Sequence, residues 1–252
     1  MQQTLELKEL REKNPDYIPR HPFEHQKDAF EHLSKLFTFK DDSPQSGILV
    51  LPTGAGKTFT AVNWICRNVL PKNVKVLWFA HTDHLLEQAY ETFRSNILET
   101  HSRETINIRV VSSNPAYSKA SDISPSDDIL IVTTQTAISN WNTNATDGKG
   151  QKRKTAFEEF IDHSKDTKLF LVLDEAHHAP AYGCRSLLIG NKDKKGIRDM
   201  IPDLYLLGLT ATPAYNDERR RGWLLEIFNT ELFEKKGIIY EADKAKLIEE
   251  GI

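Results

Sequence analysis

Short, continuous runs of apolar residues are the strongest pattern in the chain. They occupy residues 48–51, 76–80, 129–132, 169–173 and 204–207. The runs are too short for amphipathic helices and do not alternate with polar residues, as is typical of strands buried on both faces of a parallel sheet. Helix-like stretches separate several of them, at residues 58–70, 82–98 and 156–163. This alternation of strands and helices predicts a doubly wound α/β domain.

The remaining segments are less regular. Ile106, Ile108 and Val110 alternate with polar residues, which indicates a strand towards an edge of the sheet. Residues 112–128 are rich in Ser, Pro and Asp, so we expect a loop there. Residues 142–154 are polar and end in basic residues, which favours a mobile insertion, and residues 241–250 are typical of a short charged helix.

Composition narrows the class of protein. Of 252 residues, 39% are hydrophobic and the net charge is −3, so global disorder is excluded and nucleic-acid binding would need a local basic surface. Only two cysteines occur, Cys66 and Cys184, which is no disulfide framework and indicates a reducing, cytoplasmic setting. No apolar run approaches the roughly 20 residues of a membrane span, so we expect no membrane partner.

A glycine-rich loop follows the first apolar run and precedes a helical pattern. Glycines let the backbone aim its N–H groups at phosphate oxygens, and the next helix presents its positive end to the same anion. Lys57 would reach the β and γ phosphates, and the Thr58 hydroxyl would ligate Mg²⁺. The usual first glycine of the motif falls at Leu51, so the pattern is the variant P-T-G-x-G-K-T. The alternative is a glycine turn with a surface lysine. The candidate nucleotide-binding residues are Thr53, Gly54, Ala55, Gly56, Lys57 and Thr58.

An acidic pair follows the apolar run at residues 169–173. Parallel strands end at one edge, so Asp174 should lie near Lys57, where it can hold Mg²⁺, while Glu175 activates the attacking water. The alternatives are a solvated acidic strand end and a zinc site. Zinc is disfavoured because His177 and His178 are adjacent rather than four residues apart on a helix. His178 is better explained as a packing residue than as a catalyst.

A third box, Thr210-Ala211-Thr212-Pro213, ends the last apolar run. With it, the chain resembles the first RecA-like domain of a superfamily 2 DEAD/DEAH-type helicase. Its nearest relatives are the type III restriction-enzyme helicase-subunit (Res) group, for which DEAHH and GLTATP are typical. The boxes stand in the family's order, and the match runs from about Gln26 to Pro213. The resemblance implies a RecA-like P-loop NTPase domain, with a mostly parallel sheet, helices on both faces, and ATP and Mg²⁺ as cofactors.

The resemblance also implies roles for residues that the motifs alone do not explain. Gln26 matches the family's glutamine for the adenine edge, where an amide offers both a donor and an acceptor. Phe23 or Arg20 would pack on the base. His177, Thr210 and Thr212 would couple hydrolysis to movement of the nucleic acid. The alternative for the two threonines is a cap at the end of a strand.

Two further boxes resemble the family's nucleic-acid contacts. His81 and Thr82 stand where an arginine often follows Ala-His, so the threonine weakens the expected charge contact. Thr133 and Thr134 could donate to phosphate or could equally be helix N-caps. Two basic clusters would be either solvated charge or salt-sensitive phosphate contacts. They comprise Lys149, Lys152, Arg153 and Lys154, and Arg219, Arg220 and Arg221.

The domain organisation follows from the same resemblance. We expect an N-terminal extension at residues 1–20, the ATP-binding RecA-like domain at 21–240, and the start of an interdomain linker at 241–252. The family's second lobe carries arginine fingers in a Q-x-x-G-R-x-x-R box, but the last glutamine here is Gln151. The expectation is therefore one lobe of a longer protein, whose second RecA-like domain lies elsewhere in the full-length chain.

The function indicated is the ATP-binding lobe of a DNA helicase or translocase, with RNA as an alternative substrate and a role in restriction, defence or DNA processing. A nuclease or methyltransferase is a candidate partner. A second interpretation is a nucleotide-gated module that clamps nucleic acid without unwinding it, against which the intact Glu175 argues. A third, a small-molecule P-loop kinase, is disfavoured by the combination of DEAH with TATP.

The first prediction concerns turnover of the isolated chain. An arginine finger is typically worth about 10³–10⁵ in turnover, so this chain alone should bind ATP–Mg²⁺ weakly and barely hydrolyse it. Steady-state phosphate release measures this directly. Turnover of several per second that Lys57→Ala abolishes would contradict the expectation.

Overall fold

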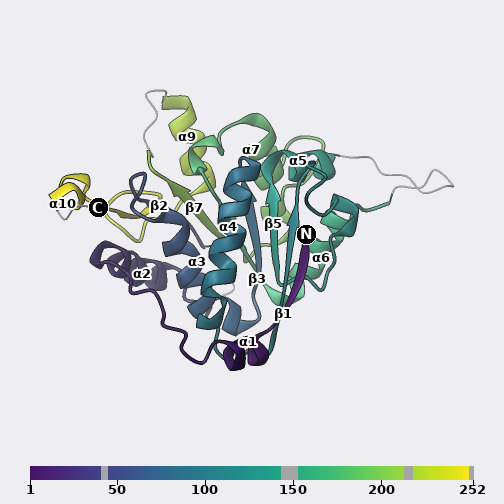
Figure 1. Ribbon diagram of the computed structural model, residues 1–252. Helices are drawn as coiled ribbons and strands as arrows, with labels where there is room; N and C mark the ends of the chain where they lie inside the picture. The colour runs from purple at the N-terminus through teal and green to yellow at the C-terminus, as the bar shows by residue number, and fades with distance from the viewer. Residues whose placement is uncertain (41–44, 143–152, 213–217, 250–252) are drawn as a thin grey trace.

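The fold is built on one sheet, seen in a computed structural model that describes residues 1–40, 45–142, 153–212 and 218–249 (Figure 1). The strands are β1 (Gln2–Glu6), β2 (Gln45–Val50), β3 (Lys75–Ala80), β4 (Thr105–Val111), β5 (Ile129–Thr133), β6 (Leu169–Leu173), β7 (Tyr205–Thr210) and β8 (Ile238–Glu241). They form an eight-stranded sheet in the order β1-β4-β5-β3-β6-β7-β2-β8. Only the β1–β4 pair is antiparallel.

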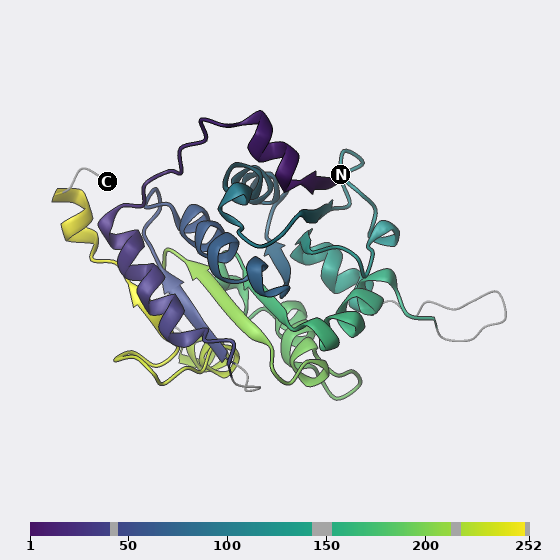
Figure 2. The ribbon, with the colours of Figure 1, turned by 90° about the horizontal axis from the view of Figure 1, so that it is seen from below.

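Helices cover both faces of this sheet (Figure 2). The α-helices are α1 (Leu7–Lys13), α2 (Glu24–Leu36), α3 (Lys57–Asn68), α4 (Asp83–Asn96), α5 (Thr134–Asn142), α6 (Ala156–Thr167), α7 (Tyr182–Ile189), α8 (Ile197–Met200), α9 (Glu218–Ile227) and α10 (Lys244–Glu249). The 3₁₀ turns in the described part of the chain are η1 (Leu70–Lys72), η2 (Ile97–Glu99), η3 (Ala120–Asp122) and η4 (Ala176–His178). One core packs α2, α3 and α4 on the sheet, and the other packs α5 to α9 on the opposite face. The predicted RecA-like architecture is confirmed.

The apolar runs form strands because both of their faces are buried. Along β3, Trp78 packs into the core beneath α3 and α4, while Leu77 and Phe79 point into the opposite core. The Trp78 ring meets Phe93 of α4 edge-on, with ring centroids 5.7 Å apart. Neither side of the strand can therefore tolerate polar residues, which explains why these runs do not alternate.

The five predicted buried strands correspond to β2, β3, β5, β6 and β7. The alternating segment is β4, but it lies one strand in from the edge because β1 pairs with its outer side. Residues 1–20, expected as an extension, thus contribute a strand and a helix, with Leu5 and Leu7 buried in the core. At the other end, α10 packs through the buried Leu247. The two ends of the chain therefore add structure beyond the motif-bearing strands.

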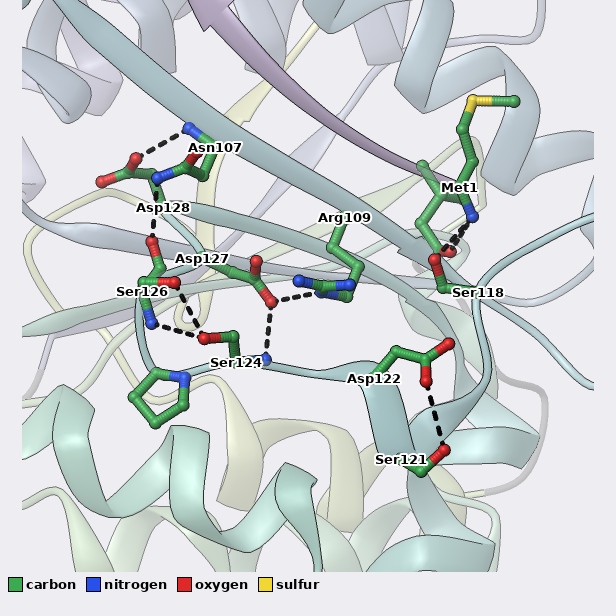
Figure 3. A network of polar contacts seen from close by, with 12 residues as sticks. Met1, Asn107, Arg109, Ser118, Ser121, Asp122, Ser124, Ser126, Asp127 and Asp128 are labelled. Atoms are coloured by element: carbon green, nitrogen blue, oxygen red, sulfur yellow. Dashed lines mark hydrogen bonds and ion pairs between the residues drawn. The ribbon is translucent and has the colours of Figure 1, made fainter.

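The loop at residues 112–128 is held to the sheet by charged side chains (Figure 3). The Arg109 Nε donates to the Asp127 Oδ2 at 2.6 Å, and both side chains are buried. The Ser124 N–H donates to the same oxygen at 2.8 Å. Beside them, the Asn107 N–H donates to the Asp128 carboxylate at 2.8 Å. The polar positions that made β4 alternate are thus used to fix the loop before β5.

Two other segments bear on the sequence analysis. Residues 143–152 of the predicted insertion lie outside the described residues. This segment includes Lys149 and Lys152. Arg153 and Lys154 are exposed, and Lys154 forms an ion pair with Asp162. Among the described residues, no helix is both long and apolar enough to cross a membrane.

The buried pair beneath the loop generates a stability prediction. The Asp127 side chain is fully buried, and its Oδ1 has no hydrogen-bond partner among the described residues. Arg109→Ala would remove the ion-pair partner of this buried carboxylate, so the free energy of unfolding should fall by about 3–5 kcal/mol in urea titrations. Arg94→Ala is the matched control, because Arg94 pairs with the exposed Glu91 and should contribute less than about 1 kcal/mol. Equal losses in the two variants would refute this account of the loop.

Candidate functional site

The predicted motifs meet at one edge of the sheet, beyond the carboxyl ends of five neighbouring strands. Val50 of β2 pairs with Thr210 of β7, and Leu173 of β6 pairs with Phe79 of β3. Ala80 in turn pairs with Thr133 of β5. The segments that follow these strands therefore stand in a row. The glycine loop lies at one end of this row, and the segments at Asp174 and Thr210 lie in the middle. The two predicted nucleic-acid contact boxes, which follow β3 and β5, lie at the other end.

The glycine loop turns through two left-handed positions. Gly54 has a φ of 88° and Gly56, the residue before α3, a φ of 79°, a region that favours glycine. A Cβ at Gly56 would also lie 2.6 Å from the Gln26 amide nitrogen, so any other residue there would displace the Gln26 side chain. The turn ends at Lys57, the first residue of α3, which points the helix N-terminus towards the loop. Backbone N–H groups at such an end favour an anion.

A cavity of about 680 Å³ opens beside the loop. Its walls include the predicted loop residues Thr53, Gly54, Gly56, Lys57 and Thr58, and the predicted acids Asp174 and Glu175. The structure therefore brings the glycine loop and the acidic pair together around one space, as the parallel order predicts.

One wall of this cavity was missed by the sequence analysis. Leu85, Gln88, Thr92 and Ser95 of α4 line it, together with Tyr17 from the N-terminal segment. The α4 residues recur every three or four positions, which places them on one helical face. That periodicity was readable from the sequence, but nothing in it indicated that this partly polar face would border the loop.

Gln26 lies behind the loop. It is almost fully buried, its Nε2 donates to the Ala55 carbonyl at 3.2 Å, and its Oε1 accepts from the Phe23 N–H at 3.0 Å. His25, which the sequence analysis did not single out, contacts the same Ala55 carbonyl through Nε2 at 3.0 Å. Both side chains thus brace the loop. A contact of Gln26 with adenine stays a prediction.

The two residues named for base packing lie apart. Phe23 is 47% exposed and stacks on His25, with ring centroids 5.9 Å apart. Arg20 lines the cavity, with its guanidinium carbon 4.6 Å from the centroid of the Phe59 ring. A cation held over an aromatic face is pre-positioned, so Arg20 has the firmer anchor beside the loop.

Asp174 is buried at the end of β6, with only 4% of its surface exposed. Its Oδ1 accepts from the Glu175 N–H at 3.0 Å, while its Oδ2 has no hydrogen-bond partner within the described part of the chain. Burial, reinforced by the nearby Glu175 charge, raises the pKa of Asp174 to about 6, against the opposing influence of Lys57. A buried carboxylate oxygen without a donor is a costly arrangement that a cation would relieve.

These residues fit a magnesium ion. Mg²⁺ prefers oxygen ligands, and in nucleotide sites it uses one or two protein oxygens together with water and phosphate. Asp174, whose Oδ2 has no partner among the described residues, and Thr58 line the same cavity. The donor set is therefore hard oxygen chemistry, in agreement with the predicted ligands. Zinc would need a different set, and the described residues contain no cluster of three or more His, Cys, Asp or Glu side chains suited to a metal.

Glu175 adopts a left-handed backbone conformation, with a φ of 53°. This costs a non-glycine residue of order 1 kcal/mol or more, and such strain is concentrated at functional sites. The turn aims the partly buried side chain into the cavity wall, where its Oε2 lies 3.2 Å from the His177 Nδ1. The predicted catalytic acid is thus oriented by a neighbouring imidazole.

His177 joins the acidic box to the third box. Its Nδ1 lies 3.2 Å from the Thr210 hydroxyl as well as near Glu175. Thr210 is fully buried, and its Oγ1 also accepts from the Thr212 N–H at 3.1 Å. The three predicted coupling residues therefore form one connected network.

A second link, which the sequence did not reveal, runs in the other direction. The ring of His178 stacks on that of His81, with centroids 4.1 Å apart and planes 13° apart, and lies equally close to His177. Partial burial and the neighbouring imidazoles lower the pKa of His178. The packing role expected for His178 fits this placement, but its partner, His81, lies in a predicted nucleic-acid contact box.

The threonine hydroxyls of the contact boxes have partners within the protein. The Thr82 hydroxyl accepts from the Leu85 N–H at 3.3 Å and so caps α4. The Thr133 hydroxyl bonds to the Thr136 hydroxyl at 2.7 Å, and the Thr134 hydroxyl donates to the Ala80 carbonyl at 3.2 Å. The capping alternative fits Thr133, whose hydroxyl also accepts from the Thr136 N–H at 3.4 Å, whereas Thr134 ties the start of α5 to β3. Contact with nucleic acid stays a prediction.

Comparison with known protein families matches residues 20–215 to the family described as "Type III restriction enzyme, res subunit". The matched region covers well over half of the chain and includes every predicted site residue. No curated protein sequence matches the chain.

Solved structures share the fold. The UvsW helicase of bacteriophage T4 has a TM-score of 0.52 and 18% identity, over 86% of this chain and 64% of its own. A hypothetical ATP-dependent RNA helicase of Sulfolobus tokodaii has a TM-score of 0.55 and 17% identity, over 94% of this chain and 57% of its own. Dbp5 of S. cerevisiae has a TM-score of 0.52 and 17% identity, over 95% of this chain and 50% of its own. The chain therefore spans between half and two thirds of these proteins.

The raised pKa of Asp174 predicts how stability changes with pH. A carboxyl whose pKa is higher in the folded than in the unfolded chain favours folding below about pH 4, and this contribution is lost as the pH rises through about 6. Without divalent cations, ionised Asp174 should thus cost about 3 kcal/mol above pH 7. Asp174→Asn should raise the urea midpoint at pH 8, and its advantage should shrink steadily towards pH 4.

Urea titrations of the wild type and Asp174→Asn across this pH range measure the effect. Asp28→Asn, at an exposed position of α2, serves as the control. A stability difference between Asp174→Asn and the wild type that stays constant from pH 4 to pH 8 would show that burial of the ionised carboxylate is not the cause.

Proposed function

The chain belongs to the family of type III restriction enzyme res subunits, and from that premise we propose that it is the ATP-binding lobe of a nucleic-acid motor. The motor couples ATP hydrolysis to movement along DNA or to its unwinding. The observation that carries the proposal is the buried, unpartnered Oδ2 of Asp174, a residue that lines the same cavity as Lys57 and Thr58. Burial of an ionised group is costly unless a charge compensates it, so a cation with a phosphate ligand suits this cavity.

Each residue at the loop has a chemical role in this proposal. Backbone N–H groups from Gly54 to Thr58 hold the phosphate oxygens, and Lys57 neutralises the β and γ phosphates. Thr58 and Asp174 hold Mg²⁺, which when bound offsets the charge that develops on the phosphates. The Glu175 carboxylate orients the attacking water and accepts its proton. Because His177 lies beside Glu175, it fixes the direction of that carboxylate.

Coupling is proposed to run through the same histidine. Thr210 and Thr212 bond to each other, and Thr210 contacts His177, so a shift of the third box would move the group that orients Glu175. Strand contacts would act on this network from β3 and β5, through His81, Thr82, Thr133 and Thr134. The His81–His178 stack supports such a route, because it joins the ends of β3 and β6.

DNA is the proposed substrate, because the matching family is described by its restriction enzymes. RNA is the alternative. We further propose that the lobe works with a second RecA-like domain of the full-length protein, which would supply the arginine finger, and with a nuclease or methyltransferase. The fact that the chain spans 50–64% of its structural neighbours supports a two-lobe arrangement. A role in restriction or defence belongs to the same proposal.

The proposal predicts that nucleotide binding and hydrolysis can be separated. Lys57→Ala should weaken binding of a fluorescent ATP analogue with Mg²⁺ by about 10- to 100-fold, because a charge-assisted phosphate contact is lost. Glu175→Gln should keep this affinity but lose the residual hydrolysis. Lys13→Ala and Glu91→Gln, on exposed helix surfaces, are matched controls that should change neither quantity.

Two results would count against the proposal. Equal analogue affinity in Lys57→Ala and the wild type would remove the phosphate loop from the site. Hydrolysis unchanged in Glu175→Gln, also with DNA present, would show that this carboxylate does not activate the attacking water.

A further inference from the structure

A second hollow lies at the same edge of the sheet, between η4, α7 and α9. It is a groove of about 290 Å³ whose walls include His177, His178, Tyr182, Arg220 and Trp223. The groove shares its histidines with the coupling network, but its other walls come from helices that carry none of the sequence motifs. Neither the glycine loop nor the acidic pair lines it. It is therefore a separate surface next to the nucleotide cavity.

Aromatic rings and guanidinium groups are combined around this groove. The guanidinium carbon of Arg185 lies 4.5 Å from the centroid of the Trp223 ring, and that of Arg219 lies 5.2 Å away. Arg185 is also within 4.0 Å of Glu226, which holds it from the far side. Guanidinium groups that stack on a ring lose little freedom when they bind, and their N–H edges still reach phosphate.

The two aromatic side chains of the groove, Tyr182 and Trp223, are accessible to solvent. Tyr182 is 72% exposed, and Trp223 is partly exposed, whereas Trp64, Trp78 and Trp141 are at most 1% exposed. Trp223 is thus the one tryptophan of the four that solvent reaches. The exposed tyrosine offers uncovered ring surface, and the tryptophan beside it keeps part of its surface accessible next to the two guanidinium groups.

The local charge is opposite to that of the whole chain. The helices α7 and α9 carry four arginines, Arg185, Arg219, Arg220 and Arg221, against two glutamates, although the chain as a whole has a net charge of −3. A cationic groove in a weakly acidic protein selects an anionic ligand. The exposed rings select a ligand that also has planar faces.

We propose that this groove binds a single strand of nucleic acid, with a base against Tyr182 or Trp223 and phosphates on the arginines. Stacking of bases on aromatic rings, alongside arginine contacts to the backbone, is how proteins hold single strands without reading their sequence. The inference rests on the proposed function and adds a contact surface that its motifs do not contain.

The position of the groove connects strand binding with the residues beside Glu175. His178 stacks on His81 on one side and lines the groove on the other. A nucleic-acid strand that contacts His81 and Thr82, after β3, can therefore reach the groove across the His178 imidazole. His177, in the same wall, contacts Glu175 and Thr210. A nucleotide bound in the groove thus contacts His177, the residue that orients Glu175.

Tryptophan fluorescence of the 252-residue chain tests the proposal, because three of the four tryptophans are buried. Titration with a 20-nucleotide oligothymidylate at low salt should quench the accessible fraction of the emission, and Trp223→Phe should abolish the quenching. In fluorescence anisotropy, Trp223→Ala should weaken binding of the labelled oligonucleotide by about tenfold. Trp223→Phe retains a ring and should bind almost as well as the wild type.

A charge variant provides an independent test. The double variant Arg219→Gln/Arg220→Gln removes two surface charges and should weaken binding, while the slope of log affinity against log salt falls by about 1.4. Arg94→Gln, an exposed arginine on α4, is the matched control and should leave affinity and slope unchanged.

The outcomes separate this inference from the proposed function. If the wild-type chain binds the oligonucleotide but shows no quenching, and the double variant binds with the same salt slope, the groove is not a strand contact and the proposed function stands. If the wild type binds no oligonucleotide even at low salt, both fail. Quenching by polyglutamate equal to that by oligothymidylate would assign the groove to an acidic protein partner and refute the inference.

Discussion

Parallel pairing of β5, β3, β6, β7 and β2 is the constraint on which the functional edge depends. The register sets Val50 beside Thr210, Gly208 beside Leu173, and Leu173 beside Phe79. Neighbouring parallel strands end at the same edge, so segments far apart in sequence are delivered to one line. Hydrophobic burial on both faces locks this register, because a slip by one residue would turn every side chain into the wrong core. The row of motifs is a consequence of how the core packs.

The same edge holds two energetic costs that the rest of the fold must offset. One is the buried carboxylate of Asp174, which lacks a donor for one oxygen. The other is the left-handed backbone of Glu175. Both positions are tolerated because β6 is buried among its neighbours and η4 packs against β7, where Gly208 leaves room for Ala176. In the proposed function a bound cation offsets the first cost, and the second is what directs Glu175 towards the cavity.

The sequence predicted the central strands of the sheet better than its edge strands and the helices α7 and α9. The central strands were readable because burial on both faces leaves an uninterrupted apolar run, and the phosphate loop was readable because only glycine suits its backbone. The edge strands β1 and β8 were missed because an edge strand needs fewer apolar residues. Helices α7 and α9 were missed because polar and charged residues interrupt their apolar stripe. The long-range contacts of Gln26, His25 and His178 were beyond prediction, since they depend on how separate elements pack.

The central claim is that the phosphate loop and Asp174 together hold a nucleotide and its magnesium. A crystal structure of the chain with a slowly hydrolysed ATP analogue and Mg²⁺ tests this most directly. The account predicts phosphates against the backbone of Gly54 to Thr58, Lys57 on the γ phosphate, and the metal between the Thr58 hydroxyl and the Asp174 Oδ2. Phosphates outside the loop, or a metal with no ligand on the Asp174 side, would contradict it.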